Sequence, residues 1–120
     1  MDFCGIAPAK FEAISLEQQF AEKIHAMVVD RGGRENSRVK DLVDALLLIE
    51  RGLNSMHVSV CLKNTFHRRG EPGVPRQLLH PPSNWRQSFG QMARECGLKY
   101  DFDSGVNALS IYWSSLQKSD

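Results

Sequence analysis

The chain has 120 residues, of which 42% are hydrophobic and 24% are charged, and its 15 basic side chains nearly balance its 14 acidic ones. This composition is typical of one soluble globular domain, and the balanced charge excludes binding to nucleic acid or membranes through a strong overall field. The longest apolar run, Ala45 to Ile49, is far shorter than the ~20 residues of a membrane span. We therefore expect a single helical domain over residues 1–120 that does not enter a membrane.

The pattern of cysteines indicates the cellular compartment in which the protein works. Cys4, Cys61 and Cys96 are odd in number, widely spaced and without the pattern of a zinc site. The N-terminal residues also lack the pattern of a secretory signal. We expect three free thiols, no metal site and a cytoplasmic protein.

Residues 1–14 are predicted to be irregular, apart from a short strand that Lys10 to Ile14 could form. Ser15-Leu16-Glu17-Gln18 then matches a capping box, and the apolar spacing that follows predicts a helix from Leu16 to Val29. The segment Arg31-Gly32-Gly33 is expected to end this helix.

A second helix is predicted with Asn36 or Ser37 as its N-cap, ending near Arg51 before a glycine. A third is predicted from about Met56 to Arg69. The alternation Val58-Ser59-Val60 would also suit a strand, but the length of the segment favours a helix.

Four prolines make residues 70–83 an irregular loop. Ser83 is predicted to cap a fourth helix that Gly97 ends, and Asp103 or Ser104 to start a fifth. The expected fold is therefore mainly α, with about five helices in a small bundle.

The second predicted helix, within the segment SRVKDLVDALLL, places three charged residues opposite its apolar stripe, Lys40, Asp41 and Asp44, with Arg38 beside them. The simplest interpretation is a water-facing edge in which Lys40 and Asp44 form an i,i+4 ion pair. Two observations favour a functional site. A base before an acid is the less favourable order for such a pair, and Leu47 and Leu48 make the helix apolar nearly all round, so that its charges would face a cleft.

The first predicted helix offers a partner for these charges. Lys23 lies away from the apolar Phe20–Ile24 side and can pair with Asp41 or Asp44. Equally, Lys23, Arg38 and Lys40 could converge on a triphosphate while the two aspartates orient them. The residues alone favour the structural pair.

The segments LEQQFAEKIHA (16–26) and RVKDLVD (38–44), in this order, resemble the AbiEii/AbiGii family of nucleotidyltransferase toxins. These are the toxin halves of bacterial type IV toxin–antitoxin and abortive-infection systems. The likeness continues through TFHRRG, PPSNW and ARECGL and covers nearly the whole chain. It implies a polymerase-β-like nucleotidyltransferase fold followed by helices, of which this chain would be the helical C-terminal part. It also implies transfer of a nucleotide from an NTP with Mg²⁺, in some members to the 3′ end of tRNA.

Four motifs build the site of that family, and the chain matches the last two. Lys23 matches the lysine of an AEK-type helix, and an Arg-x-Lys-Asp-x-x-Asp helix is matched by Arg38, Lys40, Asp41 and Asp44. The resemblance implies phosphate-binding or catalytic roles for Lys23 and Asp41, and site-shaping roles for the others. The catalytic candidates are therefore Lys23, Asp41 and Asp44, and the candidates for binding the nucleotide phosphates are Lys23, Arg38 and Lys40.

The first two motifs, a Gly-Ser or Gly-Gly turn and a metal-binding Asp-x-Asp pair, are not found, because the sequence begins where the family's sheet should already be finished. The segment DSG at 103–105 has the wrong spacing and context to replace them. Nucleotide transfer needs carboxylates on Mg²⁺, and Asp41 with Asp44 are not expected to supply that geometry alone. We therefore expect a truncated or split C-terminal portion of a toxin that transfers a nucleotide from an NTP to an RNA acceptor. Alone it should be inactive and should bind neither Mg²⁺ nor NTP strongly.

A second class of function stays open, namely a non-enzymatic helical module that binds an antitoxin or RNA. The basic loop FHRRGEPGVPRQLLHPPSNWR offers Arg68, Arg69 and Arg76 for contacts with RNA phosphates, although a solvated loop is the simpler interpretation. The missing N-terminal half or a second copy of the chain would also be a partner. Faces that once packed on the missing sheet should be covered in a homodimer or exposed as an apolar patch.

Overall fold

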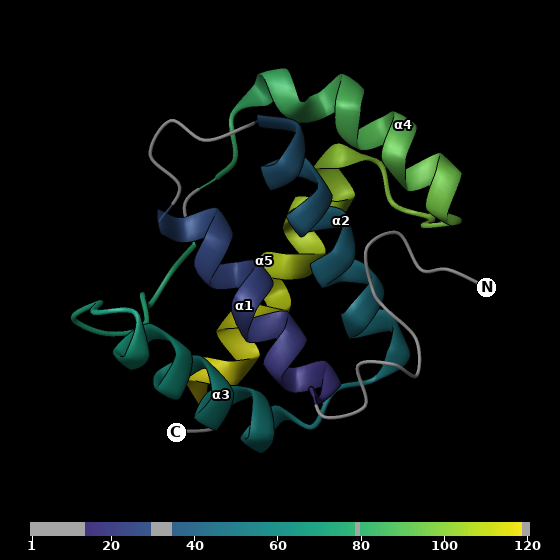
Figure 1. Ribbon diagram of the computed structural model, residues 1–120. Coiled ribbons are helices and arrows are strands. Elements are labelled where there is room, and N and C mark those ends of the chain that lie inside the picture. Colours follow the sequence, from purple (N-terminus) through teal and green to yellow (C-terminus); the bar gives the residue numbers. More distant parts are fainter. Residues whose placement is uncertain (1–13, 30–34, 79, 119–120) are drawn as a thin grey trace.

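The computed structural model describes residues 14–29, 35–78 and 80–118, and these residues form five α-helices, a short 3₁₀ segment and no strand. The predicted mainly α fold is confirmed. The predicted N-terminal strand and the Arg31–Gly33 helix end fall outside the described residues, except for Ile14, which lies in a bend. The elements (Figure 1) are α1 (Leu16–Val29), α2 (Glu35–Arg51), α3 (Ser55–Arg68), η2 (Ser83–Trp85), α4 (Arg86–Cys96) and α5 (Phe102–Lys118).

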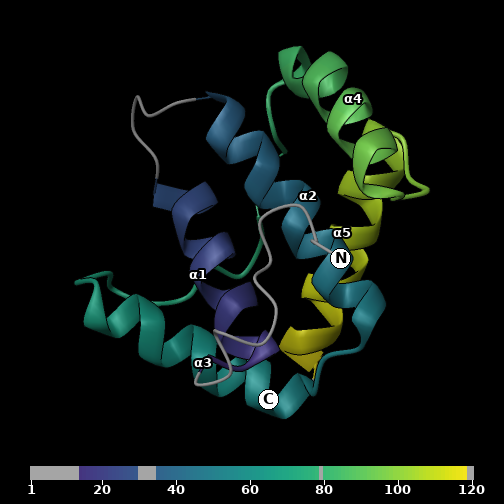
Figure 2. The same ribbon diagram turned by 45° about the vertical axis from the view of Figure 1, so that its right-hand side comes forward.

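The helices are arranged with α3 at one end of the molecule and α4 at the other, and with α1, α2 and α5 between them (Figures 1 and 2). Helix α1 packs mainly against α2 and α3, while α2 also contacts α4 and α5. Helix α2 is therefore covered on several sides. All of its residues from Asp41 to Leu48 are buried, which agrees with the apolar surface predicted around its second half.

The core is built from the apolar stripes of all five helices, and the burial of each large side chain contributes about 1.5–3 kcal/mol. Its largest fully buried side chains include Phe20, Phe66, Phe89 and Trp113. Gly105 sits where α5 approaches α2 and α4. A Cβ at this position would lie 2.9 Å from Phe89 Cζ and 3.0 Å from Leu46 Cδ1, so the glycine permits the close contact that holds α2 in place.

Helix ends differ from the predictions in several places. Ser15 caps α1 as predicted, because its Oγ accepts a hydrogen bond from Gln18 N at 3.0 Å. The side chain of Gln18, however, donates to Glu22 and Thr65, so its amide does not complete the capping box. Helix α2 begins at Glu35, and Asn36 and Ser37 therefore lie inside it instead of capping it.

The starts of α4 and α5 also differ. Ser83 begins the 3₁₀ turn η2, and α4 follows without a side-chain cap. Asp101 is the residue that caps α5, because its Oδ1 accepts a hydrogen bond from Ser104 N at 2.8 Å. Gly97 ends α4 as predicted, with a left-handed φ of 75°.

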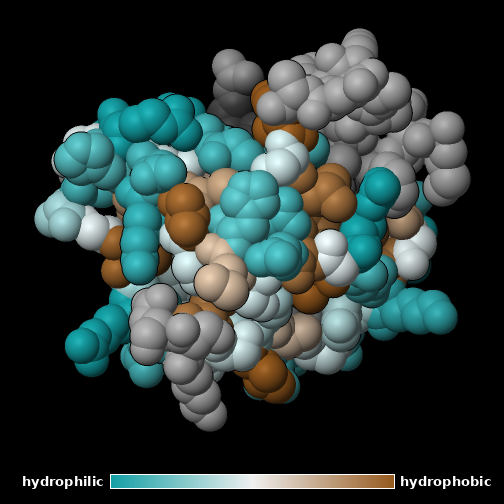
Figure 3. Space-filling view, turned by 90° about the horizontal axis from the view of Figure 1, so that it is seen from below, coloured by the Kyte–Doolittle hydropathy of each residue, from teal (hydrophilic) through white to brown (hydrophobic). Residues whose placement is uncertain are grey.

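None of the described helices combines the length and the apolar character that crossing a membrane requires. The large hydrophobic residues left exposed on the described surface are Ile14, Val28, Met56, Val60 and Ile111. Figure 3 shows hydrophobic patches interrupted by hydrophilic side chains on the face that carries α3. The expectation of a homodimer stays a prediction.

The cysteines correct one expectation. Cys61 is free and buried, and burial raises the pKa of its thiol. Cys96 is bonded in a disulfide, so the expectation of three free thiols is wrong. An argument for the cytoplasm from free thiols therefore loses its support.

Candidate functional site: a buried lysine–aspartate cluster

Helices α1 and α2 bring together the side chains that the sequence predicted to meet. Lys23 Nζ on α1 lies 3.1 Å from Asp44 Oδ2 and 3.6 Å from Asp41 Oδ1 on α2. The two aspartates are three residues apart, so both project from the same side of α2 toward α1. The predicted Lys40–Asp44 pair is replaced by this cross-helix cluster.

Burial is uneven within the cluster. The side chain of Asp44 is fully buried and that of Asp41 is 10% exposed, whereas that of Lys23 remains 25% exposed. Neither carboxylate oxygen of Asp44, nor Oδ2 of Asp41, has a hydrogen-bond partner of good geometry. Buried charges normally have both an ion pair and hydrogen bonds, so the burial of these carboxylates lowers the stability of the folded state.

The burial of the two aspartates also changes their pKa values. Burial raises the pKa of Asp41 and of Asp44 above the ordinary value for aspartate, and it outweighs the opposing attraction of Lys23. The side chain of Lys23 keeps part of its surface accessible to solvent. The cluster therefore combines one partly exposed basic side chain with two buried acidic ones.

Arg38 joins the cluster from the preceding turn of α2. Its Nη1 lies 3.3 Å from Asp41 Oδ2 and donates a hydrogen bond of 3.1 Å to the carbonyl oxygen of Ala26, near the end of α1. Lys40, by contrast, points to solvent, and it forms no ion pair among the residues that the structure describes. The cluster therefore contains Lys23, Arg38, Asp41 and Asp44, without Lys40.

The carboxylates of the cluster are poorly placed to bind Mg²⁺. The Lys23 ammonium lies where a cation between Asp41 and Asp44 would have to sit, and it would repel a metal ion. Within the described ranges, no three His, Cys, Asp or Glu side chains gather in a way that could hold a metal. The cluster therefore does not fit Mg²⁺.

Comparison with known proteins identifies the family. The family model described as the nucleotidyl transferase AbiEii toxin of the type IV toxin–antitoxin system matches residues 2–107. The chain belongs to this family. Searches of curated proteins and of solved structures found no match. Family membership confirms the resemblance seen in the sequence, and the matched range includes all four residues of the cluster.

One tripeptide of this AbiEii family member has the sequence of the Asp-x-Asp motif, which was expected to be absent. Asp101-Phe102-Asp103 has the form Asp-x-Asp. It lies at the start of α5 and not on a strand, where Asp101 caps the helix and Asp103 binds Arg86. Its carboxylates are therefore already used in local contacts.

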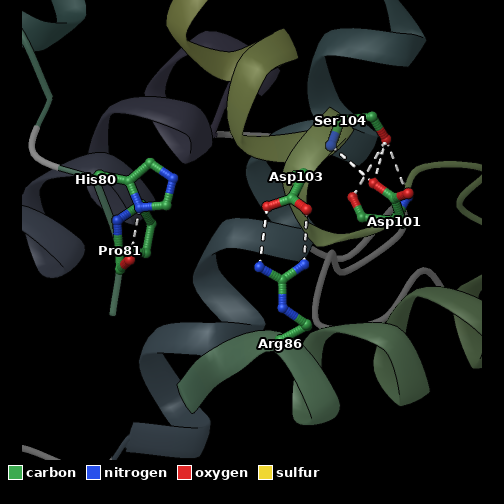
Figure 4. Close-up of polar contacts among 6 residues, drawn as sticks. All are labelled: His80, Pro81, Arg86, Asp101, Asp103 and Ser104. Atoms are coloured by element: carbon green, nitrogen blue, oxygen red, sulfur yellow. Dashed lines mark hydrogen bonds and ion pairs between the residues drawn. The ribbon is translucent and has the colours of Figure 1, made fainter. Parts of the chain in front are cut away.

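The Arg86–Asp103 pair is a second ionic site, which the sequence did not predict (Figure 4). The guanidinium nitrogens of Arg86 donate to both carboxylate oxygens of Asp103, at 2.7 and 3.1 Å. This bidentate bond ties the start of α4 to the start of α5. Because the partners lie 17 residues apart in different helices, no local spacing could have indicated it.

The three arginines proposed for RNA contact do not form one patch of free charges. Arg69 binds Glu22 Oε1 at 2.8 Å, and Arg68 lies 3.6 Å from Glu22 Oε2. Both arginine side chains remain more than half exposed, and Arg76 is exposed in the proline-rich loop. Their role in binding RNA stays a prediction.

A groove of about 650 Å³ opens beside the cluster. Arg38 and Leu42 of α2 line one wall, and residues of the proline-rich loop and of α5 line the others. Arg38 belongs to both the groove and the cluster. No sequence spacing indicated the groove, because its walls come from segments far apart in the chain.

Proposed function

We propose that this chain supplies the phosphate-binding half of a nucleotidyltransferase site, in which Lys23 and Arg38 contact the phosphates of an NTP. The observation that carries the proposal is the buried cluster, in which two costly carboxylates hold one partly exposed lysine side chain. Asp41 and Asp44 orient Lys23 and neutralise it until a phosphate arrives. Lys40 stays outside this group.

The physical support lies in the difference between this cluster and an ordinary ion pair. A salt bridge kept only for stability gains little when its carboxylates are buried without hydrogen bonds, and apolar residues of similar size often serve the fold better. Lysine and arginine in a fixed arrangement, by contrast, are well suited to phosphate oxygens. Function is therefore the better explanation for charges on a helix that is otherwise buried.

The finer parts of the proposal concern the reaction. We propose that the acceptor is RNA and that the chain alone does not transfer a nucleotide, since the cluster does not fit the Mg²⁺ that the reaction requires. Carboxylates that hold the metal would come from another polypeptide segment. An NTP as substrate would place the protein in the cytoplasm, where an antitoxin would control it.

The test is transfer of label from NTPs labelled in the α-phosphate to tRNA. The purified chain should give no incorporation. Adding a separately expressed polypeptide with the Gly-Ser and Asp-x-Asp motifs of the family should restore it. Lys23→Ala should abolish the restored signal, whereas Lys99→Ala, a change at an exposed lysine between α4 and α5, should leave it unchanged.

Three results would contradict the proposal in different ways. Labelling by the chain alone, abolished by Lys23→Ala, would show that the site is complete and that the inactivity was proposed wrongly. Equal labelling by Lys23→Ala and wild type would remove Lys23 from the site. Failure of any complementing segment, together with binding of the antitoxin, would favour the second candidate function, a non-enzymatic partner-binding module.

A further inference from the structure

The groove beside the cluster has the size and lining of a small-molecule site. Its volume of about 650 Å³ lies within the range of about 300–1,000 Å³ that is usual for ligand pockets. Apolar side chains from five segments form most of its walls, including Met27, Leu42, Pro81, Trp85 and Leu109. Polar groups are few and lie at exposed positions, where Gln77, His80 and Ser110 line the groove.

The position of the groove follows from the antiparallel packing of α1 and α2. Arg38 bonds Ala26 while Asp44 pairs with Lys23, so the start of α2 lies beside the end of α1. From Lys23, one helical turn of about 6 Å leads to Met27, which lines the groove. From Asp41, three residues lead in the same direction to Arg38. The groove therefore begins one turn beyond the cluster, with Arg38 between them.

We propose that this groove binds the heterocyclic base of the nucleotide whose phosphates contact Lys23 and Arg38. The inference rests on the proposed function and extends it. An apolar slot with a tryptophan and a histidine in its walls accepts the face of a planar base, and exposed amide and hydroxyl groups can bond its edge. Arg38, which touches both sites, would lie near the junction of phosphate chain and nucleoside.

Two long-range contacts hold the walls of the groove in place. Trp113 Nε1 donates a hydrogen bond of 3.1 Å to the carbonyl oxygen of Pro75, which anchors the proline-rich loop to α5. Arg86, next to Trp85, is fixed by its bidentate bond to Asp103 (Figure 4). A groove held in this way is largely formed before a ligand binds, which reduces the entropic cost of binding.

The experiment compares ligands that share one part of a nucleotide. Calorimetric titrations of the full chain would use each of the four NTPs, inorganic tripolyphosphate and the corresponding nucleosides. Ser110→Trp would fill the groove from α5, and Ser114→Trp is its control, because it makes the same change at an exposed serine one turn further on. Val28→Trp against Val60→Trp, both at exposed valines, gives a second pair if the first variant folds poorly.

We expect at least one NTP to bind about tenfold or more tightly than tripolyphosphate, since base stacking commonly has this effect. Ser110→Trp and Val28→Trp should remove that difference and leave the affinity for tripolyphosphate within about twofold, whereas both controls should behave as wild type. Equal affinity of tripolyphosphate and all four NTPs would overturn the base site alone, because binding of tripolyphosphate that Lys23→Ala removes would still support the phosphate site. Nucleoside binding without tripolyphosphate binding would overturn the phosphate role of Lys23. Binding of no ligand would overturn both.

Discussion

Two ion-pair sites of this protein are built in opposite ways. The Lys23–Asp41–Asp44 cluster is buried, and its carboxylates lack hydrogen bonds of good geometry. The Arg86–Asp103 pair has bidentate geometry, yet its two side chains are 55% and 65% exposed. The pKa values move accordingly, since burial raises those of Asp41 and Asp44, while the hydrogen bond from Arg86 lowers that of Asp103.

The contrast indicates that the Arg86–Asp103 pair serves the fold, whereas the buried cluster is a candidate functional site. A surface pair with good geometry costs the fold little, and it joins two helix starts. A buried pair with poor hydrogen bonding costs stability that an apolar side chain would have saved. Such a cost, concentrated on residues within the range that the family model matches, is typical of side chains that are kept for a ligand.

The largest expected effect comes from removing the cation of the buried cluster. Lys23→Met should lower the free energy of unfolding at pH 7 by about 3 kcal/mol, because it leaves two buried carboxylates without their lysine. Chemical denaturation with circular dichroism measures this change, and Lys99→Met is the matched control. Adding Asp44→Asn to Lys23→Met should recover much of the loss. A cluster that is merely a solvated edge would show little change in either variant.

Removing one anion should have the opposite sign. Asp44→Asn should raise the free energy of unfolding at pH 7, since burial makes the ionised carboxylate more costly than a neutral group of the same shape, and Asp41 still pairs with Lys23. Because the folded pKa of Asp44 is raised above the model value of 3.8, the folded state binds more protons than the unfolded state between those two pKa values. Stability therefore falls as pH rises through this window in the wild type.

The difference between Asp44→Asn and the wild type should accordingly be largest near neutral pH and shrink toward pH 4. Denaturation midpoints across this range measure the difference directly, so that contributions of other carboxylates cancel. A gain that does not depend on pH, or a loss at pH 7, would show that Asp44 is stabilised in its ionised form. The reasoning about the cost of the cluster would then fail.

Much of this site was predictable, because it depends on local helical geometry. The i,i+3 spacing of Asp41 and Asp44 places both on one side of α2, and the apolar Leu47 and Leu48 indicate a helix covered all round. A lysine on the neighbouring helix is then the natural partner. The fold class followed in the same way from the apolar stripes and from glycines such as Gly97.

Contacts between distant segments were not predictable in this way. Lys40 precedes Asp41 in the motif, but its side chain is exposed. Which side of α2 faces the cluster depends on where α1 packs, and the sequence of α2 alone does not give that position. Arg69 forms an ion pair with Glu22, which lies 47 residues away in the sequence. The groove likewise requires the relative positions of α1, α2, α5 and the proline-rich loop, which no single stretch of sequence encodes.

The smallest effect is expected at the exposed pair, and its pH dependence should run the other way. The folded pKa of Asp103 is lowered, so the stability that its ionised form contributes is present above the model value of 3.8 and is lost as pH falls through the folded pKa. Asp103→Asn should therefore lower the melting temperature slightly at pH 7, with a difference that vanishes in acid and shrinks in high salt. Asp44→Asn raises stability under the same neutral conditions, so the two substitutions should give curves of opposite sign. Curves of the same sign would mean that the two sites do not differ in the way their geometry indicates.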